Sequence, residues 1–297
     1  LQLVGQGVKV TRMKSKWLIL FIVFGLILTA CGGGSDDAAE VEEVVAEEPA
    51  ETLDAPATTA AAAEPEADPA SICLVLDIGG LGDLSFNDLA YSGYEKAIAD
   101  FGMEGTFLEP DGGGENRGEL LELCAEAGND LIIGNGFLFD ASMNEVAPNY
   151  PDLNFAITDG VAEPANVRGM LFDHAEGSFL AGVAAALKST NNHVGFLGGV
   201  DFPLIHEFEQ GFIAGVQAIN PDIVIEIGYA SVAPDFSGFN DVVKGKEIAL
   251  AQYEAGADVI YHAAGGTGTG MFEAAKEVSE STGTKVWGIG VDFDQYY

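Results

Sequence analysis

The chain has 297 residues and a formal net charge of −35 at pH 7, from 47 acidic and 12 basic residues. Nucleic-acid binding requires a positively charged surface, so this composition excludes a nucleic-acid partner. Of the charged residues, 12 acids and 4 bases precede Ala70, so the rest of the chain alone carries about −27. A charge of that sign favours solubility and does not identify the ligand.

The first thirty residues have the pattern of a targeting segment. A short basic start at residues 13–16 precedes an unbroken apolar run at 17–28, which is shorter than the roughly 20 residues of a membrane-spanning helix. The pattern predicts a lipoprotein signal peptide within residues 1–30, with an uncleaved anchor as the alternative. Residues 1–12 precede Met13, a candidate initiator, and are interpreted as an upstream extension.

Residues 31–69 have the composition of a tether. The sequence Leu-Thr-Ala-Cys ending at Cys31 resembles the lipobox of bacterial lipoproteins, in which cleavage leaves the cysteine as the first residue, carrying the lipid. Residues 32–69 contain twelve acids, no Lys or Arg and hardly a large hydrophobic side chain. Such a segment cannot bury enough apolar surface to offset its ordering entropy, so we expect a disordered acidic linker.

From residue 71 onward, short β-branched runs alternate with longer helical patterns. We expect strands at residues 72–77, 105–109, 131–134, 154–158, 168–171, 193–197, 224–228, 259–261 and 285–289. We expect helices near residues 86–101, 117–127, 140–146, 175–188, 205–219, 242–254 and 270–281. Apolar strands separated by helices predict an α/β fold with parallel sheets covered on both faces.

A polar stretch at residues 189–192 falls near the middle of this region, whose length is close to the size at which one core divides. We therefore expect two lobes, lobe 1 at residues 70–190 and lobe 2 at 191–297. Ligands of open α/β sheets bind outside the carboxyl ends of the strands. The strand-to-helix loops are therefore the candidate site.

Two glycine-rich loops follow expected strands, at residues 77–83 and 265–270, but neither has the chemistry of a phosphate site. Both lack the Lys-Ser/Thr pair of a P-loop and the G-x-G-x-x-G spacing of a dinucleotide loop. Asp77 and Asp83 in the first loop would repel a phosphate. The backbone amides of the second loop can still meet a neutral polar ligand.

The loops carry acids, an amide and aromatic rings instead. Ser85 is a candidate N-cap, which places Phe86 and Asn87 in the first turn of a helix. Carboxylates pair with vicinal hydroxyls, an amide reads a base edge and aromatic faces stack on flat rings, so the set suits a sugar joined to a heterocycle. Each residue alone is equally consistent with a cap, a turn or a core position. The candidates are Asp77, Phe86, Asn87, Asp159, Tyr261 and Asp292.

Sequence motifs for catalysis and metal binding are missing. The chain has no G-x-S-x-G, H-E-x-x-H or C-x-x-C motif, and its four histidines lack metal-ligand spacing. We therefore expect a binding protein with no cofactor and no metal, not an enzyme. Cys73 and Cys124 lie in apolar patterns compatible with two buried thiols or, in an exported protein, with a disulfide.

Six motifs follow one another between residues 72 and 295. They are Asp77-Ile-Gly-Gly with Asp83-Leu-Ser-Phe-Asn87, Gly177-Ser-Phe-Leu-Ala-Gly182, Val194-Gly-Phe-Leu-Gly-Gly199, Phe208-Glu-Gln-Gly-Phe-Ile-Ala-Gly215, His262-Ala-Ala-Gly-Gly-Thr-Gly268 and Gly290-Val-Asp-Phe-Asp-Gln295. In this order they resemble the basic membrane protein (BMP) family, the PnrA-like lipoproteins that bind substrate for nucleoside ABC transporters. The lipobox supports the resemblance independently.

The resemblance implies a type I periplasmic-binding-protein fold, with two lobes that are joined by a multi-strand hinge and close on a nucleoside. It implies that Phe86 and Tyr261 stack on the base while Asn87 and Asp159 hydrogen-bond its edge. The ribose hydroxyls would be held by Asp292 and the backbone of Gly266. Asp77 would support the site from its strand end.

The chain departs from the family in two places. Phe293 stands where relatives commonly have a small residue. Relatives also continue beyond the position of Tyr297, with a return crossing to lobe 1 and a lysine that helps bind ribose. We therefore expect the C-terminal part of the fold to be missing from this chain.

The resemblance implies a monomeric, lipid-anchored protein on the extracytoplasmic face of the cell membrane. It would capture nucleosides, purines in preference, and deliver them to the permease and ATPase subunits of an ABC transporter. The alternatives are a ligand-sensing lipoprotein and a sugar-binding receptor on the same fold. A nucleoside-processing enzyme is disfavoured because no nucleophile or acid–base pair is recognisable.

Overall fold

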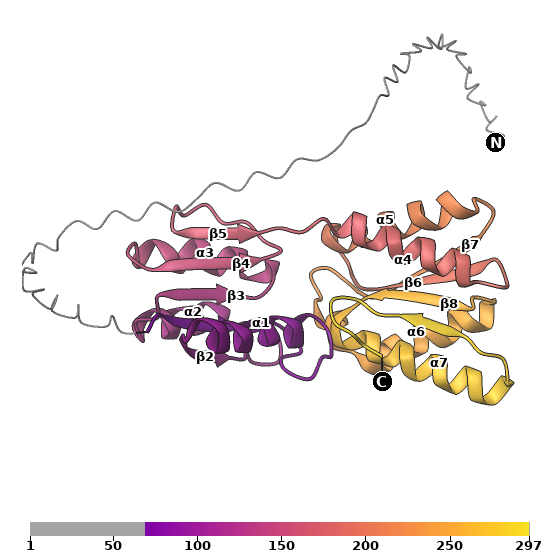
Figure 1. Ribbon diagram of the computed structural model, residues 1–297, viewed down its shortest axis with the longest axis horizontal. Helices are drawn as coiled ribbons and strands as arrows, with labels where there is room; N and C mark the ends of the chain where they lie inside the picture. Colours follow the sequence, from indigo (N-terminus) through magenta and orange to yellow (C-terminus); the bar gives the residue numbers. More distant parts are fainter. Residues whose placement is uncertain (1–68, 297) are drawn as a thin grey trace, which may run out of the picture. The chain divides into compact units, whose positions relative to one another are not determined.

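The computed structural model describes residues 69–296. The expected signal peptide, the lipidated Cys31 and the acidic linker lie outside these residues. The described chain forms two parallel sheets flanked by helices, which confirms the expected α/β class (Figure 1). Within residues 69–296, no helix has the length and apolar character needed to cross a membrane.

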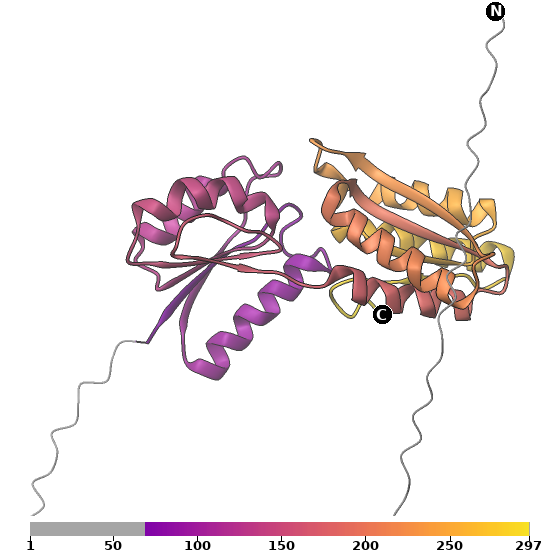
Figure 2. The ribbon, with the colours of Figure 1, turned by 90° about the horizontal axis from the view of Figure 1, so that it is seen from above.

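The first sheet has five strands in the order β2-β1-β3-β4-β5. The strands are β1 Ser71–Val75, β2 Glu104–Leu108, β3 Leu131–Gly134, β4 Asn154–Thr158 and β5 Val167–Met170, and the helices are α1 Phe86–Phe101, α2 Arg117–Glu126 and α3 Asp140–Val146. Alternate residues of β1 pack on opposite faces of the sheet, as the pleat requires. Leu74 shares a core with α1, and Val75 shares a core with α2 and α3. Figure 2 shows helices on both faces of this sheet.

Cys73 and Cys124 form a disulfide that joins β1 to α2. Their Cα atoms are 5.8 Å apart, within the usual range for a disulfide. Both residues are buried in the core beneath α2. Of the two alternatives compatible with the sequence, the structure therefore contains the disulfide.

The second sheet has four strands in the order β7-β6-β8-β9. The strands are β6 His193–Asp201, β7 Val224–Val232, β8 Val259–Ala263 and β9 Trp287–Ile289, and the helices are α4 His174–Lys188, α5 Pro203–Ile219, α6 Val242–Ala255 and α7 Gly268–Thr282. Figure 1 shows α4 and α5 on one face and α6 and α7 on the other. Each helix pair shares a core with the sheet, so both faces are covered.

Helices α4 and α5 approach so closely that glycines form their contact. A Cβ at Gly182 would collide with the carbonyl oxygen of Phe212, and a Cβ at Gly215 with that of Phe179. These glycines of the motifs at residues 177–182 and 208–215 are therefore explained by close helix packing. The packing also joins α4 to the second sheet, although α4 precedes residue 190; the lobe boundary placed there stays a prediction.

Several elements are longer than expected, and β6 and α5 are two of them. Strand β6 continues through Gly198 and Gly199 to Asp201 and stays in register with β7, whereas the sequence predicts an end at residue 197. Glycine has a low strand propensity, so the sequence gives no sign that the strand continues. Glycine is required at residue 198 because a Cβ there would collide with the Tyr229 ring. Helix α5 begins at Pro203, two residues early, because proline fits a first helical turn.

Candidate functional site

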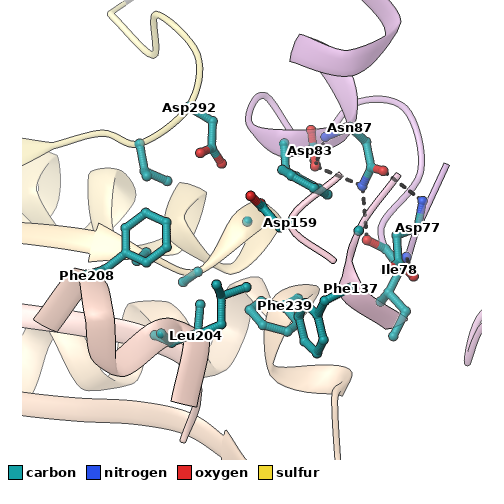
Figure 3. A pocket seen from close by; sticks show the side chains of 17 residues that line it. Asp77, Ile78, Asp83, Asn87, Phe137, Asp159, Leu204, Phe208, Phe239 and Asp292 are labelled. Atoms are coloured by element: carbon teal, nitrogen blue, oxygen red, sulfur yellow. Dashed lines mark hydrogen bonds between the residues drawn. The ribbon is translucent and has the colours of Figure 1, made fainter. Parts of the chain in front are cut away.

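A cavity lies at the carboxyl ends of the strands, where the sequence predicts the ligand. Its walls come from the loops after β1, β3 and β4 of the first sheet, and from α5 and the segments after β8 and β9 of the second. Among the described residues, no Lys or Arg lines the cavity. Four carboxylates do, those of Asp77, Asp83, Asp159 and Asp292 (Figure 3). The chemistry is therefore unsuited to phosphate and suited to a neutral ligand.

Asp83 is the side chain that caps helix α1. Its Oδ1 accepts the backbone N–H groups of Ser85 at 2.9 Å and Asp88 at 3.1 Å, and its Oδ2 accepts that of Asn87 at 2.9 Å. Ser85 occupies the N-cap position, but its side chain makes no capping hydrogen bond. The Ser85 hydroxyl instead donates to Asp292 Oδ2 at 2.9 Å, which ties the start of α1 to the segment after β9.

Asn87 lies on the cavity wall with its amide already bonded within the loop. The amide oxygen accepts the Asp77 backbone N–H at 2.9 Å and Asn135 Nδ2 at 3.3 Å. The amide nitrogen donates to the Ile78 carbonyl at 3.1 Å and to Asp83 Oδ2 at 3.0 Å. Both donors and both acceptor positions of the amide are used, so in this structure Asn87 braces the loop. Its contact with a base edge stays a prediction.

Asp77 forms a buried ion pair with Arg117, a partner that the sequence analysis missed. Arg117 Nε donates to Asp77 Oδ1 at 2.9 Å, and both side chains are about nine-tenths buried. Desolvation raises the pKa of Asp77, although Arg117 counteracts the rise. The missed signal is the position of Arg117, a cation at the first residue of a helix, where the helix dipole disfavours it. The pair supports the loop from behind the cavity.

Gly136 allows Asp77 and Phe86 to lie side by side. A Cβ at Gly136 would sit 2.8 Å from Asp77 Oδ2 and 3.3 Å from a ring atom of Phe86, and its φ of 124° also favours glycine. Phe86 lines the cavity, as the sequence predicts. The backbone after β3 thus fixes the position of this ring.

Asp159 and Asp292 come from different sheets, and their carboxylates point toward one another across the cavity (Figure 3). Both residues have left-handed backbone conformations, with φ of 55° and 63°, which Asp tolerates in tight turns. Although Asp292 keeps solvent contact, partial desolvation of its carboxylate raises its pKa to about 6, and repulsion from Asp159 and Asp83 adds to the rise.

Two predicted contacts are not among the cavity-lining residues. Tyr261 is 4% exposed, and its ring packs in the core with Phe196 and Phe212 at centroid distances of 5.8 and 5.4 Å. It lies within strand β8, of which only the last residue, Ala263, lines the cavity, together with the residues that follow the strand. Gly266 is buried beside Gly265, which does line it.

Phe208 and Phe239 supply the aromatic wall on the side of the second sheet. Phe208 lies on α5 and stacks on His174, with ring centroids 4.5 Å apart and planes 22° from parallel. Phe208 belongs to one of the motifs that carry the family resemblance, but its four-residue spacing to Phe212 does not distinguish a cavity residue from a core residue. Nothing in the local sequence around His174 indicates a contact with the cavity wall.

Phe137 joins the loop after β3 to the loop after β6. Its ring stacks on Phe202 with centroids 4.8 Å apart, and the edges of Phe236 and Phe239 complete the cluster. Phe137 and Phe239 line the cavity, so this aromatic cluster closes one end of it (Figure 3).

Comparison with known proteins gives one family. The family model of ABC transporter substrate-binding protein PnrA-like matches residues 71–297. The CD4+ T-cell-stimulating antigen of Listeria innocua is 35% identical over 286 residues, covering 94% of this chain and 72% of that protein. The ABC transporter nucleoside-binding protein BmpA of Lactococcus lactis is 36% identical over 234 residues, covering 75% of this chain and 64% of that protein.

A solved structure agrees with these sequence matches. An ABC transporter solute-binding protein from Aeropyrum pernix aligns with a TM-score of 0.67 and 32% identity, covering 75% of this chain and 62% of that one. This likeness confirms the expected periplasmic-binding-protein fold. The same matches confirm the expectation of a substrate-binding protein and not an enzyme.

Proposed function

Because the chain belongs to the PnrA-like family of ABC transporter substrate-binding proteins, we propose that its cavity binds nucleosides, purine nucleosides in preference. The relative from Lactococcus lactis is named as nucleoside-binding, which supports the ligand class. In this proposal the protein captures the nucleoside outside the cytoplasm and passes it to the permease and ATPase subunits of a transporter.

The observation that carries the proposal is the composition of the cavity wall. Aromatic rings line the cavity from both lobes, Phe86 from α1 and Phe208 from α5, and the carboxylates of Asp159 and Asp292 line it as well, without a Lys or Arg on the wall. Rings stack on a flat base, and carboxylates accept hydrogen bonds from hydroxyl and N–H groups. A nucleoside offers all of these groups without a phosphate.

In the proposed complex the base lies between Phe86 and Phe208. Asp159 accepts an N–H from the base edge, which favours purines with an N–H at that edge, such as inosine and guanosine. Asp292 accepts the ribose hydroxyls, together with backbone groups near Gly266. Asp77 and Asn87 hold the loop in place, and Tyr261 supports the core beneath the cavity.

The N-terminal segment completes the proposed mode of action. Cys31 carries the lipid that holds a monomer at the outer face of the cell membrane, and the acidic linker lets the binding domain move away from it. Residues 32–69 are 38 residues, which reach roughly 125 Å when fully extended at about 3.3 Å per residue, so a linker of this length gives the domain wide access to a permease.

Isothermal titration of the purified protein with inosine, guanosine, adenosine, cytidine and ribose tests the ligand class. We expect binding of the nucleosides, tightest for inosine or guanosine, and no heat with ribose. Binding of free sugars without any nucleoside would reject the proposal in favour of a sugar receptor. Deletion of the gene should abolish nucleoside uptake; unchanged uptake with an altered transcriptional response would instead indicate a sensor.

A further inference from the structure

His174 is the first residue of α4, and it contacts two residues of the cavity wall without lining the cavity itself. Its side chain is 10% exposed. On one side it meets Asp159 from the loop after β4, and on the other it meets Phe208 from α5. A single imidazole therefore supports both the proposed base-edge acceptor and one proposed stacking ring.

The contact with Asp159 leaves the carboxylate able to accept another donor. His174 Nε2 lies 3.2 Å from Asp159 Oδ1, which is an ion-pair distance. The geometry is not that of a hydrogen bond, and Asp159 Oδ1 is buried without any hydrogen-bond partner among the described residues. The ion pair balances the charge of this oxygen but uses none of its hydrogen-bond positions, so the oxygen can still accept an N–H from a ligand.

The contact with Phe208 depends on the ring of His174. The two rings stack nearly in parallel, and a protonated imidazole over an aromatic face adds electrostatic attraction to the packing. Loss of the proton removes that attraction and, at the same time, the ion pair with Asp159. The two wall residues are therefore coupled through one titrating group.

The charges around His174 favour its protonated form. Carboxylates face it from three elements: Asp159 after β4, Glu207 on α5 and Asp292 after β9. The side-chain interaction with Asp159 raises the pKa of His174 above its ordinary value, burial opposes the rise, and Glu207 and Asp292 add to it. The proton is therefore retained above the pH at which an isolated histidine loses it.

We propose that His174 is a positioning residue for the nucleobase: when protonated, it holds the Asp159 carboxylate and the Phe208 ring where a base with N–H groups on its edge contacts both. This inference rests on the proposed function. It predicts that the affinity for inosine decreases when His174 loses its proton.

Deprotonation of Asp292 should have the opposite effect on affinity to deprotonation of His174, so a pH profile can distinguish the two groups. The carboxyl group of Asp292 accepts ribose hydroxyls more strongly when it is ionised, so affinity should increase as the pH rises through about 6. Affinity should then decrease at higher pH as His174 is deprotonated. The wild-type profile is expected to have an acid limb set by Asp292 and an alkaline limb set by His174.

The test is the dissociation constant of inosine between pH 5 and 8, below the range in which the base itself titrates. We expect the wild-type affinity to decrease by up to about tenfold per pH unit on the alkaline limb, since one proton is coupled to binding. His174→Gln keeps a hydrogen-bond donor and His174→Phe keeps the stacked ring. Both variants should bind more weakly near pH 6.5 and lose the alkaline limb.

His193→Gln is the matched control. His193 pairs with Glu226 at 3.1 Å and lies outside the cavity lining, so this variant should keep both limbs of the profile. An alkaline limb that persists in His174→Gln, or a wild-type profile without that limb, would overturn the role of His174 alone. A wild-type protein that binds no nucleoside at any pH would overturn the proposed function, and with it this role.

A ligand-free measurement tests the pair independently. The ring resonances of His174, identified by their loss in His174→Gln, should titrate at a higher pH in the wild type than in Asp159→Asn. Unchanged titration of His174 in Asp159→Asn would contradict the coupling of these two residues.

Discussion

In the loop after β1, the carboxylate and amide groups are already hydrogen-bonded within the protein, whereas the acids after β4 and β9 remain able to accept new partners. The Asp83 carboxylate and the Asn87 amide already have hydrogen-bond partners in the loop and in the first turn of α1. Asp159 Oδ1 has no hydrogen-bond partner among the described residues, and Asp292 accepts only the Ser85 hydroxyl there. The same residue types thus stabilise the loop after β1 and offer hydrogen-bond acceptors after β4 and β9.

The largest expected effect is a loss of stability when the ion pair behind the loop after β1 is broken. Arg117→Met leaves the Asp77 carboxylate buried and unpaired, which should destabilise the protein by about 3–5 kcal/mol. Chemical denaturation measures this loss. The control is Lys96→Met, which removes an exposed ion pair with Asp100 and should change stability little. Equal stability of the two variants would show that the Asp77–Arg117 pair does not support the loop.

The disulfide beneath the same wall should have the next largest effect. Replacing both Cys73 and Cys124 with alanine releases a link between residues 51 positions apart, and such a loss costs about 2–4 kcal/mol. Thermal unfolding with and without a reducing agent should show the same difference in the wild type. Insensitivity of the wild type to reduction would indicate that the two thiols are not linked in the isolated protein.

The aromatic walls should affect binding and not folding. Phe86→Ala and Phe208→Ala should each weaken nucleoside binding by about 1–3 kcal/mol, the cost of losing one base stack, with little change in melting temperature. Tyr261→Phe is the contrasting variant, because it removes only the hydroxyl that lies 3.2 Å from Ser178 Oγ. It should leave affinity unchanged. A loss of affinity in Tyr261→Phe comparable to that in Phe208→Ala would indicate that Tyr261 contacts the ligand.

The smallest effect concerns Asp292, where binding and stability should change in opposite directions. The folded protein raises the pKa of this carboxyl to about 6, so ionisation between pH 4 and 6 opposes folding. Asp292→Asn should therefore slightly raise the melting temperature at pH 7 while it weakens inosine binding. A decrease in both quantities would mean that Asp292 is structural.

The sequence predicts the fold better than it predicts the site. Apolar strands and helical periodicity locate all the strands and helices in the described region, because local patterns determine them. The C-terminal end of β6 was missed because Gly198 and Gly199 fit only through tertiary contacts with neighbouring rings. The rule that ligands bind at the carboxyl ends of parallel strands also predicts that Phe86, Asp159 and Asp292 lie near one another, and all three line one cavity.

The remaining site residues depend on packing between segments far apart in the chain. Tyr261 and Phe208 are both aromatic residues in apolar patterns, and only the direction of each side chain decides which one reaches the cavity. Arg117 and His174 have no local signal of their carboxylate partners, which lie 40 and 15 positions earlier in the chain. Side-chain direction and pairing across the fold are therefore what the sequence left undetermined.

Parallel calorimetric titration of the protein with inosine and with its 5′-monophosphate tests whether the cavity selects an uncharged nucleoside. Carboxylates without a basic residue on the wall should accept inosine and exclude the phosphate. We predict saturable binding of inosine and no measurable binding of the monophosphate. Equal or tighter binding of the monophosphate would contradict this interpretation of the cavity.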